Sequence, residues 1–179
     1  AEVPIPDCKG DAEAPDVLFG ARPDVLNHNI ETVPRLQRAV RPSASYARSL
    51  AVLARAKAAG LVTKSGIIVG MCETDDEVAA TLADLAGVGV DIVTIGQYLR
   101  PTTHHLPVAR WVTPEQFAAF AELGTALGIG HVESSPLTRS SYHARQAAGA
   151  PPAHSAATDP TPAGRRPCTD RPTTSRCGP

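Results

Sequence analysis

The chain has 179 residues, enough to bury one hydrophobic core of ordinary size. Its net charge at pH 7 is −1, so bulk charge gives no reason to expect a nucleic acid or an anionic membrane as a partner. No apolar run approaches the ~20 residues that span a bilayer. The four cysteines are too scattered for a disulfide framework, which favours a reducing compartment.

Composition divides the chain into a body, residues 1–145, and a tail, residues 146–179. The tail contains no Val, Ile, Leu, Met, Phe, Tyr or Trp, and seven of its 34 residues are proline. Burial cannot repay the entropy of ordering such a segment, so we expect a disordered tail. Four arginines and two aspartates give it a charge of +2. A solvated tail without a function is favoured over one that contacts a partner.

Short apolar runs alternate with helical patterns through the body, which is typical of βα units and a parallel sheet. The predicted strands are residues 3–6, 25–28, 61–69, 91–97 and 131–134. We expect the second, third and fourth of these strands to be adjacent and parallel. The pattern predicts the α/β class, but it does not choose between an open sheet and a barrel.

Capping residues indicate three helix starts, at Ser43, Thr74 and Thr113. Thr74 opens a capping box that Glu77 completes, and Pro114 stands at a first helical position. Gly60 ends the first of these helices.

Polar residues follow the second predicted strand. Alternation puts Asn27, Asn29 and Glu31 on one side, where their amide and carboxylate groups suit a polar ligand. The alternative is a hydrogen-bonded strand end with a helix cap. Arg41 either faces a carboxylate or is solvated. Gln97 ends the fourth predicted strand, where a polar side chain suits a cleft at the carboxyl ends of parallel strands.

Other residues carry weaker signals. Tyr98 either lines the same cleft or is a core aromatic with a satisfied hydroxyl. The neighbouring pair His104 and His105 lacks further ligands at zinc spacing, so a structural role is favoured over metal binding.

Three segments in this order resemble the C-terminal half of lipoyl synthase, a radical S-adenosylmethionine (SAM) enzyme. They are Asn-His-Asn-Ile-Glu-Thr-Val-Pro-Arg at 27–35, Gly-Gln-Tyr-Leu-Arg-Pro at 96–101 with His-His-Leu-Pro at 104–107, and Arg-Ser-Ser-Tyr-His-Ala at 139–144. The resemblance covers residues 2–146. It implies strands three to six of a partial (β/α)6 radical SAM barrel with a C-terminal extension, and the first two strands would be missing.

The resemblance implies SAM as the ligand. The residues that we expect around SAM are Asn27, Asn29, Glu31, Arg41, Lys64, Ser65 and Gln97, with Lys64 and Ser65 inside the barrel lumen. Gly70 would permit a close backbone approach. Cys72 stands where the family pattern has glycine, and a left-handed turn there would tolerate cysteine badly. Either the turn relaxes or the site is impaired.

The resemblance also implies that a serine binds the auxiliary 4Fe–4S cluster. Ser141 is the predicted ligand, and Ser140 is the second candidate. An alkoxide is a more exchangeable ligand than a thiolate, which suits a cluster that donates sulfide. Just before this motif, Ser135 and Thr138 replace the usual glycine and valine, while Pro4 inside the first strand would remove a ladder hydrogen bond.

The cysteines do not match the family's clusters. Radical SAM enzymes use C-x3-C-x2-C, and lipoyl synthases add a second triplet for the auxiliary cluster. No two of the four cysteines here, Cys8, Cys72, Cys168 and Cys177, have cluster spacing. We therefore expect a fragment whose triplets lie upstream and a 179-residue chain that is inactive alone.

The function that the resemblance implies is sulfur insertion at C6 and C8 of a protein-bound octanoyl group to give lipoyl-lysine. Implied cofactors are two 4Fe–4S clusters and SAM. Implied partners are octanoylated lipoyl domains, of the glycine-cleavage H protein and of 2-oxoacid dehydrogenase subunits, and a reducing electron donor, in a bacterial cytoplasm. The alternatives are another radical SAM sulfur-inserting enzyme, which the Arg-Ser-Ser-Tyr motif opposes, and an inactive degenerate fragment.

Overall fold

The computed structural model describes residues 1–11 and 13–140. The predicted tail and the predicted cluster ligand Ser141 lie outside the described residues. The elements in chain order are β1 Glu2–Pro4, η1 Cys8–Gly10, α1 Ala14–Gly20, β2 Val25–Asn27, η2 Pro34–Leu36, α2 Gln37–Val40, α3 Tyr46–Ala58, β3 Thr63–Val69, α4 Asp75–Gly87, β4 Ile92–Gln97, α5 Pro114–Ala126 and β5 His131–Ser135.

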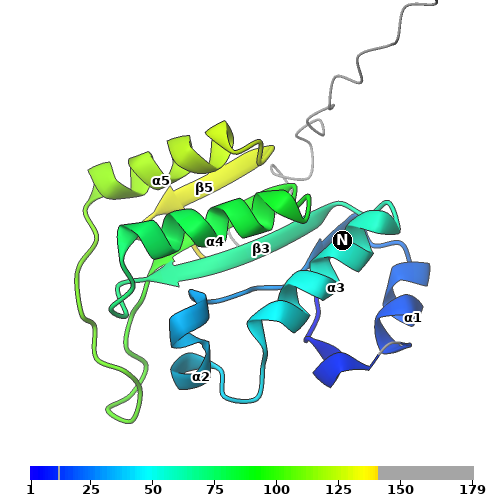
Figure 1. Ribbon diagram of the computed structural model, residues 1–179, viewed down its shortest axis with the longest axis horizontal. Coiled ribbons are helices and arrows are strands. Elements are labelled where there is room, and N and C mark those ends of the chain that lie inside the picture. The colour runs from blue at the N-terminus through cyan, green and yellow to red at the C-terminus, as the bar shows by residue number, and fades with distance from the viewer. Residues whose placement is uncertain (12, 141–179) are drawn as a thin grey trace, which may run out of the picture.

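The strands form one parallel sheet in the order β1-β2-β3-β4-β5 (Figure 1). β3 and β4 make the longest pairing, from Lys64 opposite Ile92 to Val69 opposite Gln97. All five predicted strands are present, and the α/β class and the adjacency of the middle three are confirmed. Consecutive strand order is the order of a (β/α) barrel wound in one direction, whereas doubly wound sheets reverse their strand order.

The hydrophobic core lies between the sheet and its helices. Alternate residues of the two central strands, Ile67 and Val69 of β3 and Val93 and Ile95 of β4, belong to it. Their partners come from three helices and include Leu53, Val78, Leu82, Leu85, Phe117 and Phe120. Because side chains alternate along a strand, the intervening residues face the opposite side of the sheet.

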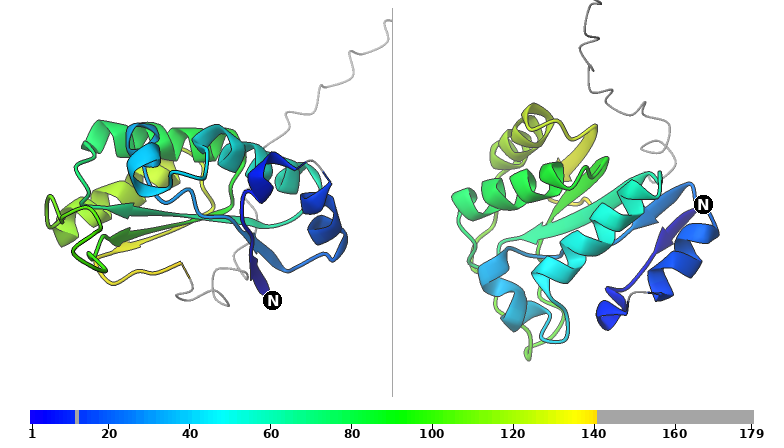
Figure 2. Two further views of the ribbon diagram at one scale, coloured as in Figure 1. Left: turned by 90° about the horizontal axis from the view of Figure 1, so that it is seen from below. Right: turned by 45° about the vertical axis from the view of Figure 1, so that its right-hand side comes forward.

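That opposite, inner face is mixed, because polar side chains lie on it beside a buried apolar pair, Val25 and Ile92. It carries Glu2 on β1, Lys64 on β3, Thr94 on β4 and Glu133 on β5. In the left view of Figure 2, α3 and α4 lie above the sheet, while the segment that follows β5 runs beneath it. The inner face corresponds to the lumen of a barrel, and its polar residues suit a ligand rather than a hydrophobic core.

Two of the three predicted helix starts are confirmed, since the Thr74 and Thr113 side chains cap α4 and α5 and the capping box with Glu77 is complete. The start predicted at Ser43 is wrong. Ser43 lies in a turn that the Ala44 amide closes onto the Arg41 carbonyl at 3.0 Å, and α3 begins only at Tyr46. Gly60 does follow the end of α3, with φ +77°.

Pro4 does not weaken the pairing of β1 with β2. The Ile5 amide donates to the Asn27 carbonyl at 2.9 Å, and the Ala1 carbonyl accepts from Val25 at 3.3 Å. In a parallel ladder alternate residues bond to the same neighbour, so the Pro4 nitrogen points away from β2. The expected loss of a ladder hydrogen bond is wrong for this register.

Candidate ligand-binding site

A cavity of about 170 Å³ opens on the inner face near the carboxyl ends of the strands. Its walls are Asn29 and Glu31 after β2, Gly66, Ile67 and Ile68 of β3, Thr94 and Gly96 of β4, and Thr138, Arg139 and Ser140 after β5. Ligands of parallel α/β folds bind at this end of the sheet. Of the residues predicted for SAM and the auxiliary cluster, the cavity brings together Asn29, Glu31 and Ser140.

Asn29 offers this cavity an acceptor. Its side-chain oxygen Oδ1 is buried and has no hydrogen-bond partner in the described part of the chain. Arg41 holds the backbone at this point, because its Nη1 donates to the Asn29 carbonyl at 2.9 Å and to the Ile30 carbonyl at 3.3 Å. Arg41 therefore braces the Asn29 segment. A buried, unpaired carbonyl oxygen suits a ligand that carries hydroxyl or amine donors.

Glu31 enters the cavity wall from a left-handed backbone conformation, with φ +68°. Its amide donates to the Gly66 carbonyl and its carbonyl accepts from the Ile68 amide, each at 2.9 Å. These bonds hold the strained residue in the sheet. Left-handed residues other than glycine are uncommon, and they concentrate at functional sites.

Gly66 and Thr94 form the floor of the cavity. A Cβ on Gly66 would lie 2.9 Å from Asn29 Oδ1 and 3.0 Å from the Thr94 hydroxyl oxygen. Glycine at this position thus leaves room for both polar side chains. Sequence reasoning did not single out Thr94. Thr94 could have been predicted as a cavity residue, because it stands two residues before Gly96 and therefore on the same face of the strand.

Lys64 enters the lumen as predicted, but at a level below the cavity. It is fully buried, and its Nζ lies 3.0 Å from Oε2 of Glu2. Asn27 donates from Nδ2 to Oε1 of the same carboxylate at 2.8 Å. The Lys64 ammonium and the Asn27 amide nitrogen are therefore committed to Glu2, while Asn27 Oδ1 is buried without a partner in the described residues. Sequence reasoning missed Glu2 because it lies 62 residues from Lys64.

Ser65 and Gln97 lie on the helix-facing side of the sheet, so the expectation that they join the others in one cleft is wrong. The Ser65 hydroxyl accepts from the Ile30 amide at 3.2 Å. The Gln97 side chain accepts from the Val112 amide at 2.9 Å and donates to the Arg110 carbonyl at 3.1 Å. Both are neighbours in sequence of inner-face residues, and alternation turns them outward.

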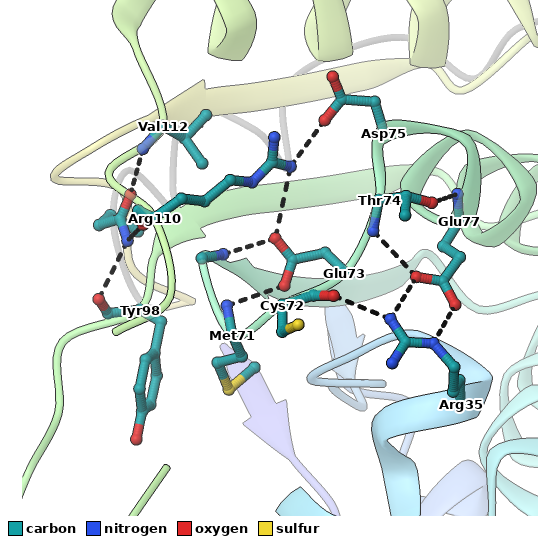
Figure 3. A network of polar contacts seen from close by, with 12 residues as sticks. Arg35, Met71, Cys72, Glu73, Thr74, Asp75, Glu77, Tyr98, Arg110 and Val112 are labelled. Atoms are coloured by element: carbon teal, nitrogen blue, oxygen red, sulfur yellow. Dashed lines mark hydrogen bonds and ion pairs between the residues drawn. The ribbon is translucent and has the colours of Figure 1, made fainter. Parts of the chain in front are cut away.

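A polar network at the carboxyl end of β3 holds the turn between β3 and α4 (Figure 3). The buried Glu73 carboxylate accepts from the Gly70 amide at 2.6 Å and the Met71 amide at 2.9 Å. Arg110 lies 3.5 Å from Glu73 and 2.6 Å from Asp75. The network ties the segment after β4 to the end of β3.

Cys72 keeps the left-handed turn, with φ +93°. Its carbonyl accepts from Arg35 Nη2 at 2.8 Å, and the same guanidinium pairs with Glu77 at 2.7 Å (Figure 3). The hydrogen bond from Arg35 and that from the Thr74 amide lower the pKa of the Glu77 carboxyl to about 2. The turn has not relaxed, so the strain predicted at this cysteine is present.

Within residues 1–11 and 13–140, no three His, Cys, Asp or Glu side chains are grouped to hold a metal ion. The described cysteines, Cys8 and Cys72, therefore do not fit a radical SAM cluster.

His105 accepts or donates a hydrogen bond with the Thr102 hydroxyl at 2.8 Å, in keeping with a structural role. The helices of the described residues are too short or too polar to cross a membrane.

The strands wind in one direction, as in part of a (β/α) barrel, and residues 5–85 match the Radical SAM superfamily. The chain is also similar to lipoyl synthases. It is 57% identical to the lipoyl synthase of Rubrobacter xylanophilus over 147 residues, 81% of this chain and 46% of that protein.

Other relatives agree. The lipoyl synthase of Chlorobaculum parvum is 58% identical over 141 residues, 78% of this chain and 48% of the relative. That of Mycobacterium avium is 54% identical over 153 residues, 83% of this chain and 50% of the relative. The chain spans about half the length of the curated relatives it matches.

Proposed function

We propose that this chain forms the C-terminal half of a lipoyl synthase, which inserts sulfur at C6 and C8 of a protein-bound octanoyl group. The observation that carries the proposal is the identity to lipoyl synthases over about four-fifths of the chain. The Arg-Ser-Ser-Tyr motif favours this reaction over other radical SAM sulfur insertions.

In the complete enzyme, SAM and two 4Fe–4S clusters would supply the radical and the sulfur. This chain's own part in SAM binding is to present acceptors. Asn29 and Glu31 would accept from the hydroxyl and amine donors of SAM, and Arg41 would keep Asn29 in position. Thr94 adds a hydroxyl group on the cavity floor.

The serine pair would give the auxiliary cluster its oxygen ligand. Ser140 lines the same cavity as Asn29, and Ser141, the next residue, remains the predicted ligand. A ligand beside the SAM cavity would keep the sulfur donor close to the carbon that loses hydrogen. Removing the true ligand should stop sulfur insertion but leave SAM cleavage intact, and Ser141→Ala compared with Ser140→Ala tests which serine it is.

The proposed substrates are octanoyl-lysine domains of the glycine-cleavage H protein and of 2-oxoacid dehydrogenase subunits. A reducing electron donor of the bacterial cytoplasm would complete the system. The 179-residue chain alone is proposed to be inactive, because its four cysteines lack the C-x3-C-x2-C spacing that holds a radical SAM cluster.

A chimaera tests this function. The upstream half of the Rubrobacter xylanophilus relative is joined to this chain, reconstituted with iron and sulfide without oxygen, and mixed with SAM, dithionite and octanoylated H protein. We expect 5′-deoxyadenosine and lipoyl-lysine from the chimaera, and neither from the 179-residue chain. A chimaera that makes no lipoyl-lysine, while the whole relative does so under the same conditions, would contradict the proposal.

A further inference from the structure

The segment after β5 folds back across β4. Ser135 ends β5, and Thr138, only 1% exposed, lies against Gly96. A Cβ built on Gly96 would lie 2.2 Å from the Thr138 carbonyl oxygen and 3.2 Å from the carbonyl carbon. The backbone of Thr138 therefore occupies the space that any side chain at position 96 would need.

Space, and not backbone conformation, explains glycine at position 96. Gly96 is absent from the residues with positive φ, unlike Gly70 at φ +108°. The three atoms nearest to its hypothetical Cβ all belong to Thr138 and Arg139. The backbone conformation would therefore accept a side chain here, and the segment after β5 takes its place.

Hydrogen bonds within the segment after β5 also hold it in place. The Thr138 amide donates to the Ser135 carbonyl at 3.1 Å, which closes a turn. Arg139 Nη1 donates to the Thr138 carbonyl at 2.7 Å. The Thr138 carbonyl oxygen thus lies against Gly96, and the Arg139 guanidinium, which is also close to Gly96, holds it there. Two residues further on, Ser140 reaches the cavity that Asn29 lines.

We propose that Gly96 is a positioning residue, whose missing side chain seats residues 138–140 against β4 and thereby delivers Ser140 to the SAM cavity. The seat itself follows from the contacts of Gly96. The role of this contact in catalysis rests on the proposed function, because only in that function does a serine bind the iron of the auxiliary cluster.

The size of the effect follows from the distance. A Cβ at position 96 would need the Thr138 carbonyl to move by about 1 Å to reach an ordinary carbon–oxygen contact. A misplacement of ~1 Å in a positioned group costs on the order of 100-fold in rate. The substitution Gly96→Ala should therefore impair sulfur insertion about 100-fold. Because Gly96 also lines the SAM cavity, SAM cleavage is measured beside it, and the loss in sulfur insertion should exceed any loss in SAM cleavage.

The first measurement needs no cofactor. Hydrogen exchange of the 179-residue chain is compared between wild type, Gly96→Ala and the control Gly87→Ala, whose added Cβ would meet nothing within 4 Å. We expect the peptide containing Thr138 to exchange at least ~10-fold faster in Gly96→Ala only, with residues 92–95 still protected. Unchanged exchange at Thr138 would overturn the seat. If Gly96→Ala does not fold, Arg139→Ala frees the same carbonyl without substituting a residue of the sheet.

The second measurement uses the reconstituted chimaera. Gly96→Ala should lose about 100-fold in lipoyl-lysine formation, more than it loses in 5′-deoxyadenosine formation, and should alter the Mössbauer spectrum of the auxiliary cluster. The control Gly87→Ala should do neither. An unaltered spectrum with full lipoyl-lysine formation would overturn the positioning role. An inactive wild-type chimaera would instead overturn the proposed function, and hydrogen exchange would then decide the seat alone.

Discussion

The hydroxyl groups of Ser135 and Thr138 lie 2.8 Å apart and hydrogen-bond to each other at the turn that leaves β5. These are the two positions at which the resemblance leads one to expect glycine and valine. Each hydroxyl supplies the partner that the other needs, and Thr138 is buried. The two departures are therefore coupled, and together they leave the turn before the serine pair intact.

This coupling predicts a non-additive mutant cycle. Ser135→Ala leaves the buried Thr138 hydroxyl unpaired and should lower the free energy of unfolding by ~1–3 kcal/mol. Thr138→Val should cost less, because the half-buried Ser135 hydroxyl can turn to water. The double variant should cost less than Ser135→Ala alone. Urea unfolding of the 179-residue chain measures all four proteins, and strictly additive losses would show that the two hydroxyls do not interact.

Cys72→Gly should stabilise the chain. A left-handed residue with a Cβ costs ~1–2 kcal/mol, of which a glycine recovers part after its own entropy loss. We expect a gain of roughly 0.5–1 kcal/mol in the free energy of unfolding. Cys72→Ala is the matched control, since it removes the thiol and keeps the Cβ. Equal gains in both variants would attribute the effect to the thiol and not to φ.

His28 should make stability depend on pH. Burial, then the nearby Arg41 charge, lower its pKa from the ordinary 6.5. Its Nδ1 lies 2.9 Å from the Ile5 carbonyl oxygen, which can only accept, so Nδ1 carries the proton of the neutral ring. Below pH 6.5, His28 binds a proton more readily in the unfolded chain than in the folded chain. Stability should therefore fall as pH drops from 7 to 5, by up to ~1.4 kcal/mol per pH unit.

Urea midpoints between pH 5 and 7.5 check this pH dependence. His28→Gln should flatten it, although the variant loses stability at neutral pH. His104→Asn, at an exposed position in the segment after β4, should leave it unchanged. A slope that survives in His28→Gln would assign the titration to another group.

The two asparagines that follow from β2 should differ in SAM binding by the reconstituted chimaera. Asn29→Ala removes the free acceptor of the cavity, and we expect ~10-fold weaker binding, which corresponds to one lost hydrogen bond. Asn27→Ala removes a partner of Glu2 below the cavity and should affect folding stability more than affinity. Equilibrium dialysis of SAM against both variants decides between them. A larger loss of affinity for Asn27→Ala would exclude Asn29 as the principal acceptor.

Local sequence determined the elements of this fold. The five strands follow from apolar runs, and the starts of α4 and α5 follow from caps that bond within four residues of Thr74 and Thr113. The left-handed turn at Cys72 was predicted from the resemblance, because the family pattern has glycine there, and a cysteine by itself does not indicate such a turn. The helix start at Ser43 was not. A turn onto Arg41 delays α3, and nothing in the local sequence distinguishes Ser43 from Ser45 as the cap.

Tertiary structure alone decided what the site residues do. Alternation relates Lys64 to Ser65 and Gly96 to Gln97, but only packing shows which of each pair faces the helices. Glu2 reaches Lys64 across 62 residues, and Thr138 lies on Gly96 from the end of another strand. Contacts between segments so distant in sequence leave no local pattern, because they arise when the sheet curves and brings strand ends together. The chain order of its motifs therefore indicated a lipoyl synthase, whereas the cavity walls and the seat of the serine segment exist only in the folded sheet.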